Sequence, residues 1–462
     1  MTDNSDSIPT PILSHSDPKL SELTRSTDVA TIIDPRDFNR YEVVKTLSID
    51  SDPLKVILDP GTGTKPASVD AFGRLRIASP LTLFDSSHRY RDNNLWSTST
   101  ASGGTSTFNA NQGLVDLAVT TTSGSKVYRE TTKVFSYQPG KSLLVMTTFV
   151  MNPEKENLRQ RVGYYGASNG LYLELDGTTL SFVERSSISG SPLETKIAQA
   201  NWNYDPMDGS GPSGMTLDIT KAQILWMDIE WLGLGTVRLG FVIDGKVILC
   251  HEFHHANLIQ STYITTGSLP LRYEIENTGA TASNSTLKQI CSTVISEGGY
   301  ELRGLEQSIA TPITAPASLA VAGTYYPVIS LRLKASPNRL DAIVIMTALS
   351  LLGSSGNTYY NWRVIASGTT TGGTWTSAGA DSAVEYNTGG TSFSGGRTVA
   401  QGFLSTTNQS SAPVDILKEA LFKFQLERDS FTSTPYELSL VVSGSTASTN
   451  VYVAVDWEEI SR

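Results

Sequence analysis

Three residues near the middle of the chain have the spacing of a zinc-peptidase motif. His251, Glu252 and His255 read H-E-x-x-H, in which two imidazoles on one helix face bind zinc and the glutamate acts as a base. The sequence around them predicts a strand, because apolar residues alternate from Leu239 to Phe253 around an Asp244-Gly245 hairpin turn. Residues four apart in a strand lie roughly 13 Å apart, whereas zinc lies about 2 Å from each nitrogen. We therefore interpret the motif as a return strand that runs into a loop.

Asp228 and Glu230 suggest a second chemistry, the hydrolysis of a glycosidic bond between two carboxylates. Jelly-roll glycosidases place such acids on one strand in the pattern E-x-D-x-E, but Trp226 stands here in place of the first glutamate. The apolar alternation from Leu225 to Trp231 indicates that both acids lie on the outward, polar face of a strand. We expect no catalytic residue, and hence no enzyme.

Asp205 and Asp208 suggest calcium binding, because both lie in the loop from Trp202 to Pro212. Their spacing does not match an EF-hand loop, and aspartate beside proline and glycine is common in turns. We therefore expect no metal ion and no cofactor.

Four aromatic residues are candidates for stacking on sugar rings if they are exposed. They are Trp202, Tyr204, Tyr164 and Tyr165. Burial in a core is the commoner fate of such residues. Carbohydrate binding at a host surface is therefore an alternative that the sequence leaves open.

The elements that must position these residues are strands. The 462 residues include 39% hydrophobic residues, only 17% charged residues and 38 glycines, a composition typical of many short strands joined by tight turns. Asp-Gly pairs at Asp176-Gly177 and Asp244-Gly245 predict hairpins, whereas the Ser, Thr and Gly segment from Ser97 to Thr107 predicts a surface loop. The expected fold class is all-β, with two antiparallel, jelly-roll-like β-sandwiches.

The chain divides into four predicted parts. Residues 1–45 are polar, contain several prolines and show no sustained periodicity, which predicts an extended N-terminal arm that orders on binding. Residues 46–109 form a docking segment, residues 110–305 a jelly-roll-like sandwich, and residues 306–462 a C-terminal sandwich.

The charge and the apolar runs limit the partners. A net charge of −10 argues against nucleic-acid binding, which needs clustered Lys and Arg. The opening MTDNSDSIPTPILS lacks a basic start before an apolar core, so we expect no signal peptide. The longest apolar run, from Ala342 to Gly353, is too short to span a bilayer. We expect a protein made in the cytoplasm and not inserted into a membrane.

Several long blocks, in the same order, resemble tailed-bacteriophage virion proteins that have an AFGRLR…TLFD segment before a jelly-roll-like domain. The blocks are DAFGRLRIASPLTLFD (Asp70 to Asp85), Gln160 to Ser187, the loop from Trp202 to Gly214, Ile229 to Gly245, His251 to Asn257 and LPLRYEIENTG (Leu269 to Gly279). Proteins of this family are usually called structural, tail or fibre proteins. The resemblance implies neither a cofactor nor a catalytic residue.

The resemblance leads to an expectation about assembly. It implies a non-enzymatic structural component of the virion, on the capsid, neck or tail, that is assembled in the host cytoplasm. We expect a homo-oligomer, a trimer or a ring, whose arm docks on other virion proteins. Arg74, Arg76 and Phe84 are the candidate assembly contacts. The alternatives are a module that binds a host-surface glycan and, with less support, a polysaccharide depolymerase.

Overall fold

The computed structural model describes residues 29–33, 41–45, 79–92, 94–406 and 424–461. The chain forms two compact units, residues 1–77 and 78–462. In the first unit, β1 (Val29–Ile33) and β2 (Tyr41–Lys45) pair as antiparallel strands. The predicted extended arm thus includes a two-stranded hairpin, and its other residues lie outside the described ones.

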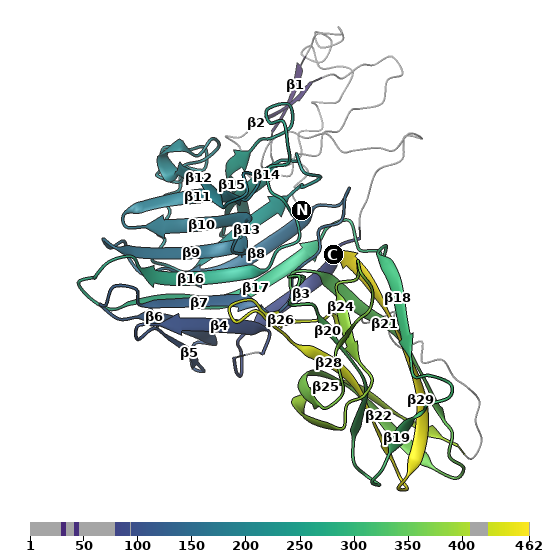
Figure 1. The fold of residues 1–462 in the computed structure, drawn as a ribbon. Helices are drawn as coiled ribbons and strands as arrows, with labels where there is room; N and C mark the ends of the chain where they lie inside the picture. Colours follow the sequence, from purple (N-terminus) through teal and green to yellow (C-terminus); the bar gives the residue numbers. More distant parts are fainter. Residues whose placement is uncertain (1–28, 34–40, 46–78, 93, 407–423, 462) are drawn as a thin grey trace, which may run out of the picture. The chain divides into compact units, whose positions relative to one another are not determined.

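The second unit begins with a sandwich of two antiparallel sheets. The seven-stranded sheet runs in the order β12 (Leu193–Ala198), β11 (Thr179–Ser186), β10 (Gly170–Asp176), β9 (Leu158–Tyr165), β16 (Leu271–Asn277), β7 (Lys126–Thr131) and β4 (Trp96–Ala101), and these strands lie side by side in Figure 1. The eight-stranded sheet contains β15 (Lys246–Phe253), β14 (Val237–Ile243), β13 (Gln223–Ile229), β8 (Leu143–Val150), β17 (Ser285–Ser296), β6 (Leu114–Val119) and β5 (Thr105–Asn109), with β3 (Leu81–Ser87) paired to β17. A 3-10 turn, η2 (Gln199–Asn201), follows β12.

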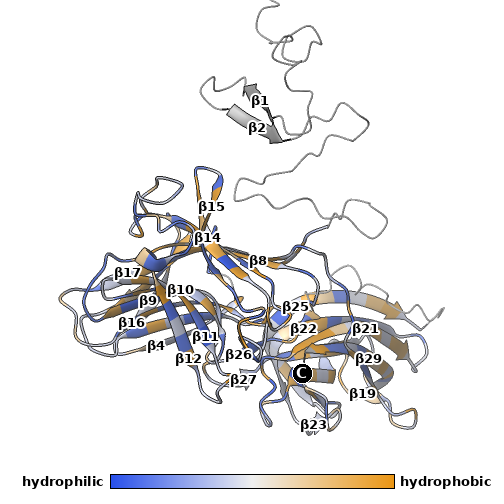
Figure 2. Cartoon of the chain, turned by 90° about the horizontal axis from the view of Figure 1, so that it is seen from above, coloured by the Kyte–Doolittle hydropathy of each residue, from blue (hydrophilic) through white to orange (hydrophobic). Residues whose placement is uncertain are grey.

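The core of this first sandwich lies between the two sheets. Alternate residues of β9, β10 and β16 are fully buried, among them Val162, Leu173 and Tyr273. They face alternate residues of the other sheet, including Met227 and Phe241, in one continuous cluster. Figure 2 shows the same alternation of hydrophobic and hydrophilic residues along the strands. A period of two residues is what a strand with one apolar face requires.

The second sandwich is formed by the C-terminal part of the chain. Its six-stranded sheet runs in the order β23 (Thr376–Ser377), β24 (Val384–Asn387), β20 (Tyr326–Leu333), β28 (Glu437–Gly444), β22 (Tyr359–Thr371) and β25 (Ser392–Ser405). The other sheet has β29 (Thr449–Ser461) between β21 (Ile343–Gly353) on one side and β18 (Leu305–Ala310) and β19 (Ala317–Leu319) on the other. A short pair, β26 (Arg428–Asp429) with β27 (Thr434–Pro435), lies outside both sheets. The core includes Trp362, Leu440 and Trp457.

The all-β prediction with two antiparallel sandwiches is confirmed, but one segment differs. The expected surface loop from Ser97 to Thr107 forms most of β4 and β5, and β3 also joins the first sandwich. The first sandwich therefore begins near residue 81, before the predicted boundary at residue 110. Threonine favours strands, and the alternating Ser and Thr residues of β4 suit the solvated face of an edge strand. Strand β17 ends at Ser296 and β18 of the second sandwich begins at Leu305.

The Asp-Gly turns fix the strand register. Asp244 and Gly245 have φ values of 52° and 75°, as a type I′ hairpin requires. At the other pair, Asp176 still belongs to β10 and pairs with Thr179, so the turn residues are Gly177 and Thr178. That turn lies one residue later than predicted. No helix in the described part of the chain is long and apolar enough to cross a membrane.

Candidate functional site

The H-E-x-x-H residues lie on a strand and the loop after it, as predicted. His251 and Glu252 belong to β15, and His255 follows its end. The ring nitrogens of His255 lie 2.6 Å from the Gly235 carbonyl oxygen and 2.7 Å from Glu184 Oε2, and the ring stacks on Tyr263 with centroids 3.9 Å apart. Both nitrogens of His255 therefore serve the packing of the loop.

His251 is buried and neutral. Burial, helped by the charge of His254 and opposed by Glu252, lowers the pKa of His251 from 6.5 to about 4. Its Nδ1 accepts a hydrogen bond from the Asn203 backbone N–H at 3.3 Å. Only a deprotonated Nδ1 can accept this bond. His251 therefore attaches the loop from Trp202 onward to β15.

The acids of the glycosidase-like pattern have structural partners. Asp228 Oδ2 lies 2.6 Å from Arg238 Nη2 on the neighbouring strand β14. Trp226, in place of the missing glutamate, donates from Nε1 to the Ile248 carbonyl oxygen at 3.2 Å. Glu230 follows the end of β13 and is exposed, and its backbone N–H donates to the Thr236 carbonyl oxygen at 3.2 Å. The Asp228 carboxylate and the Trp226 indole therefore connect strands of the same sheet.

The aspartates considered for calcium organise their own loop. Asp205 is buried and accepts backbone N–H groups from Met207 and Ser213, each at 2.8 Å. Asp208 accepts the backbone N–H of Ser210 at 2.9 Å. Among the described residues, no group of three or more His, Cys, Asp or Glu side chains has the arrangement of a metal site.

The structure contradicts the expected exposure of three of the four aromatic candidates. Trp202 is 5% exposed, stacks on Phe182 at 4.3 Å and donates from Nε1 to a backbone carbonyl oxygen. Tyr164 and Tyr165 are fully buried. Tyr204 is 45% exposed, and its hydroxyl donates to Glu252 Oε2 at 2.9 Å. The apolar rings of the first three are better accommodated by the core than by water.

Of the three candidate assembly contacts, the structure describes only Phe84. Phe84 is 6% exposed and packs in the core of the first sandwich, with its ring centroid 4.8 Å from that of Phe135 and 6.0 Å from that of Trp96. Phe84 therefore serves the core of the chain itself, and its predicted role as an assembly contact stays a prediction. Arg74 and Arg76 lie outside the described residues.

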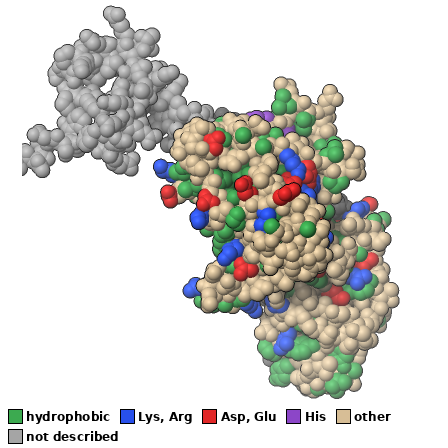
Figure 3. All heavy atoms as spheres, turned by 90° about the vertical axis from the view of Figure 1, so that its left-hand side faces the viewer, with side chains coloured by type: hydrophobic (Ala, Val, Ile, Leu, Met, Phe, Trp, Pro, Cys, Tyr) green, Lys and Arg blue, Asp and Glu red, His purple; other side chains and the backbone are tan. Residues whose placement is uncertain are grey.

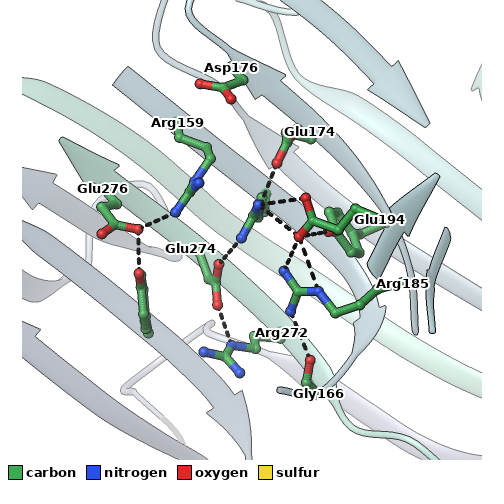
Figure 4. A network of polar contacts seen from close by, with 12 residues as sticks. Arg159, Gly166, Glu174, Asp176, Arg185, Glu194, Arg272, Glu274 and Glu276 are labelled. Carbon is green, nitrogen blue, oxygen red and sulfur yellow. Dashed lines mark hydrogen bonds and ion pairs between the residues drawn. The ribbon is translucent and has the colours of Figure 1, made fainter. Parts of the chain in front are cut away.

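A feature that the sequence reasoning missed is a network of buried ion pairs on the polar face of the seven-stranded sheet. Arg161 of β9 is the central residue, because β9 lies between β10 and β16. Its guanidinium group lies 2.6 Å from Glu174 of β10 and 3.5 Å from Glu274 of β16. Figure 4 shows Glu174, Glu274 and other charged side chains of this network close together. We call the whole network of ion pairs the charge ladder.

The charge ladder continues in both directions across the sheet. Glu194 of β12 lies 3.2 Å from Arg161 and 2.8 Å from Arg185. Burial opposes ionisation of Glu194, but Arg185, Arg161 and the Tyr172 hydroxyl lower its pKa to about 2. On the other side, Arg272 of β16 contacts Glu274 at 2.6 Å and Glu130 of β7 at 3.3 Å. Opposite charges thus alternate over neighbouring strands, which is the arrangement that buried charges require.

Arg428 ends the charge ladder and comes from the segment before the last two strands of the second sandwich. Its guanidinium group lies 2.7 Å from Glu130 and 3.0 Å from Asp341, and Nη1 donates to the Thr131 carbonyl oxygen at 2.5 Å. The side chains of Arg428 and Glu130 are each 2% exposed. Burial raises the pKa of Glu130, and Arg428 and Arg272 oppose that shift. The second sandwich therefore supplies a cation that a buried carboxylate of the first one needs.

A signal for the charge ladder exists in the sequence, although only in retrospect. Charged residues repeat every second position in Arg159-x-Arg161, in Glu174-x-Asp176 and in Arg272-x-Glu274-x-Glu276. Such spacing places them on one strand face. On the outer face of the molecule shown in Figure 3, acidic and basic side chains are likewise interspersed and not gathered by sign.

Comparisons with known proteins give structural similarities at very low identity. No protein-family model matches the chain, and no curated protein matches it. Similar solved structures include the Bacteroides ovatus mixed linkage glucan PUL GH16 protein (9% identity, 46% of this chain and 99% of that chain, TM-score 0.32). Two others come from phages. One is a carbohydrate esterase of the Shiga toxin-encoding bacteriophage phi24B (11% identity, 47% of this chain and 100% of that chain, TM-score 0.28). The other is the CBM2 module of the evolved Dit of Lactobacillus casei BL23 phage J-1 (6% identity, 49% of this chain and 100% of that chain, TM-score 0.32). At these scores the similarities carry no argument about function.

Proposed function

We propose that the chain is a non-enzymatic structural component of a tailed-phage virion, located on the capsid, neck or tail. The charge ladder carries this proposal. The blocks that resemble phage virion proteins supply five of its residues: Gln160 to Ser187 contains Arg161, Glu174 and Arg185, and Leu269 to Gly279 contains Arg272 and Glu274. The residues of the resemblance therefore build a rigid framework, and their charges neutralise one another.

The residues with the spacing of catalytic motifs support the same proposal. Asp228 is paired with Arg238, and both ring nitrogens of His255 have partners within the chain. A glycosidase needs one carboxyl group as a proton donor and a second as a nucleophile or base, whereas the Asp228 carboxylate forms an ion pair with Arg238 at 2.6 Å. Hydrolysis of a host polysaccharide by the purified protein would contradict this part of the proposal.

We further propose that the protein acts as a homo-oligomer, a trimer or a ring. Both sandwiches are open sheets with edge strands, such as β25 and β12, and edges favour association with another chain. Residues 1–45 are proposed to dock on other virion proteins. Size-exclusion chromatography with light scattering tests the first point, and a monomer at micromolar concentration would contradict it.

The carbohydrate-binding alternative requires another set of residues than the sequence indicated. Trp202, Tyr164 and Tyr165 are buried, and only Tyr204 of those four is exposed. A glycan site built on buried Trp202, Tyr164 or Tyr165 is therefore not proposed.

A further inference from the structure

A cavity of about 570 Å³ in the second unit combines aromatic and polar side chains. Five separate segments line it: residues 136–139 with Lys141, Trp231 after β13, residues 265–268, the linker residues Glu301 and Arg303, and Ile460 of β29. Its volume lies within the range of roughly 300 to 1,000 Å³ that is usual for small-molecule sites. None of the motifs in the sequence indicated this cavity.

The indole of Trp231 is held in one orientation. A Cβ atom at Gly267 would lie 2.8 Å from the Trp231 ring, so the Gly267 backbone packs directly against it. The ring of Tyr137, which is buried, meets Trp231 edge-on, with centroids 5.8 Å apart and an interplanar angle of 79°. Trp231 itself is only half-buried. A fixed and partly exposed aromatic ring suits the C–H face of a sugar.

The Trp231 side chain also has an unused donor. Nε1 of Trp231 is buried and has no hydrogen-bond partner among the residues that the structure describes. A buried polar group without a partner costs free energy. A ligand oxygen that accepts from Nε1 would remove that cost.

The polar side of the cavity is held in place by Gln138. Its Oε1 accepts from the Glu301 backbone N–H at 3.0 Å and from Lys141 Nζ at 3.2 Å. Arg303 lies 2.7 Å from the Glu301 carboxylate, and both side chains are mostly exposed. Two cations and one carboxylate thus surround the opening. A carboxylate-bearing ligand would be attracted to the cations.

We propose that this cavity binds a saccharide that carries a carboxylate, such as a uronic acid unit of a bacterial surface polysaccharide. Trp231 contacts the ring and donates from Nε1 to a hydroxyl, while Lys141 and Arg303 bind the carboxylate. Thr266 and Ser268 supply hydroxyl groups at the same cavity. This role goes beyond the proposed structural one, and either can fail without the other.

The test is a glycan microarray with two matched sets of probes, uronic-acid-containing oligosaccharides and neutral glucose oligosaccharides. The full chain is expected to bind the acidic set at least tenfold more strongly. Trp231→Phe, which keeps a ring but removes Nε1, and Arg303→Gln are each expected to weaken binding at least tenfold. Because Arg303 is 79% exposed, its substitution should leave the fold intact even if Trp231→Phe does not.

Tyr90→Ala is the matched control, because Tyr90 is an exposed aromatic residue of the same unit that does not line the cavity. Its binding is expected to equal that of the unsubstituted chain. The proposal is overturned if no acidic probe binds, if neutral probes bind equally well, or if Arg303→Gln binds as well as the unsubstituted chain. Loss of binding in Tyr90→Ala would also overturn it.

Discussion

At the scale of single residues, the environment decides what a side chain can do. His251 and His255 have the spacing of a zinc motif. His251 nevertheless accepts a backbone hydrogen bond, and the ring nitrogens of His255 contact Gly235 and Glu184. The sequence predicted this outcome, because the alternation around Asp244-Gly245 required strands. It left open whether Trp202 and Tyr165 are exposed, and both are buried, Trp202 after η2 and Tyr165 in β9.

The neutral, buried histidines predict acid sensitivity. Burial lowers the pKa values of His251 and His88 from 6.5 to about 4. The unfolded chain therefore binds protons more readily, so the stability these residues contribute is present above about pH 6.5 and is lost as the pH falls to 4. Urea unfolding at several pH values should show this loss.

His251→Asn is the informative variant for this prediction. The asparagine Oδ1 can still accept from Asn203, but it does not titrate. Stability should therefore fall less steeply between pH 6.5 and 4 than in the unsubstituted chain. If the free energy of unfolding fell equally steeply with pH in both proteins, His251 would not contribute to the acid sensitivity.

At the scale of elements, strand pairing brings together residues that are far apart in the sequence. Turn residues and the alternation of apolar with polar residues predicted most strands of the first sandwich, because both depend only on residues that are neighbours in the sequence. The charge ladder was not predicted, because Glu130, Arg161 and Arg272 meet only when β7, β9 and β16 become neighbours. The missed strands β4 and β5 have the Ser and Thr composition of a loop, and their pairing with β7 and β6 overrides it.

The close contact of β9 and β10 predicts that Gly163 tolerates no side chain. A Cβ atom there would lie 2.4 Å from the Leu171 carbonyl oxygen and 2.6 Å from Tyr172 Cα. Gly163→Ala should reduce the free energy of unfolding by about 1 to 3 kcal/mol, as overpacking does. Thermal denaturation measures this, with Gly356→Ala as the control, because a Cβ atom at Gly356 meets nothing within 4 Å. Equal stability of the two variants would contradict the prediction.

At the scale of the whole second unit, Arg428 links the two sandwiches. Besides Glu130 and Thr131, its backbone N–H donates to the Thr132 carbonyl oxygen at 3.0 Å, and Gln425 donates to the Val134 carbonyl oxygen at 2.7 Å. The segment that contains β26 is thereby attached to β7 and the residues after it. The two sandwiches should therefore unfold together.

Arg428→Met should separate their unfolding. It leaves the Glu130 carboxylate buried with Arg272 as its remaining arginine partner, so the free energy of unfolding should fall by about 3 to 5 kcal/mol. Differential scanning calorimetry is expected to show two transitions in place of one. Arg303→Met removes an exposed pair instead and should leave the transition unchanged, because solvent screens such a pair. A single, unshifted transition in Arg428→Met would contradict the linking role.

The central claim is that the protein is a structural part of a phage particle, and quantitative mass spectrometry of purified particles tests it most directly. Particles are separated from free protein on a density gradient, and the copy number is measured against the major capsid protein. We predict several copies per particle, in a fixed ratio that survives a salt wash, because structural subunits assemble as symmetric oligomers. Absence from the particles, with the protein found only in the unassembled fraction, would contradict the claim.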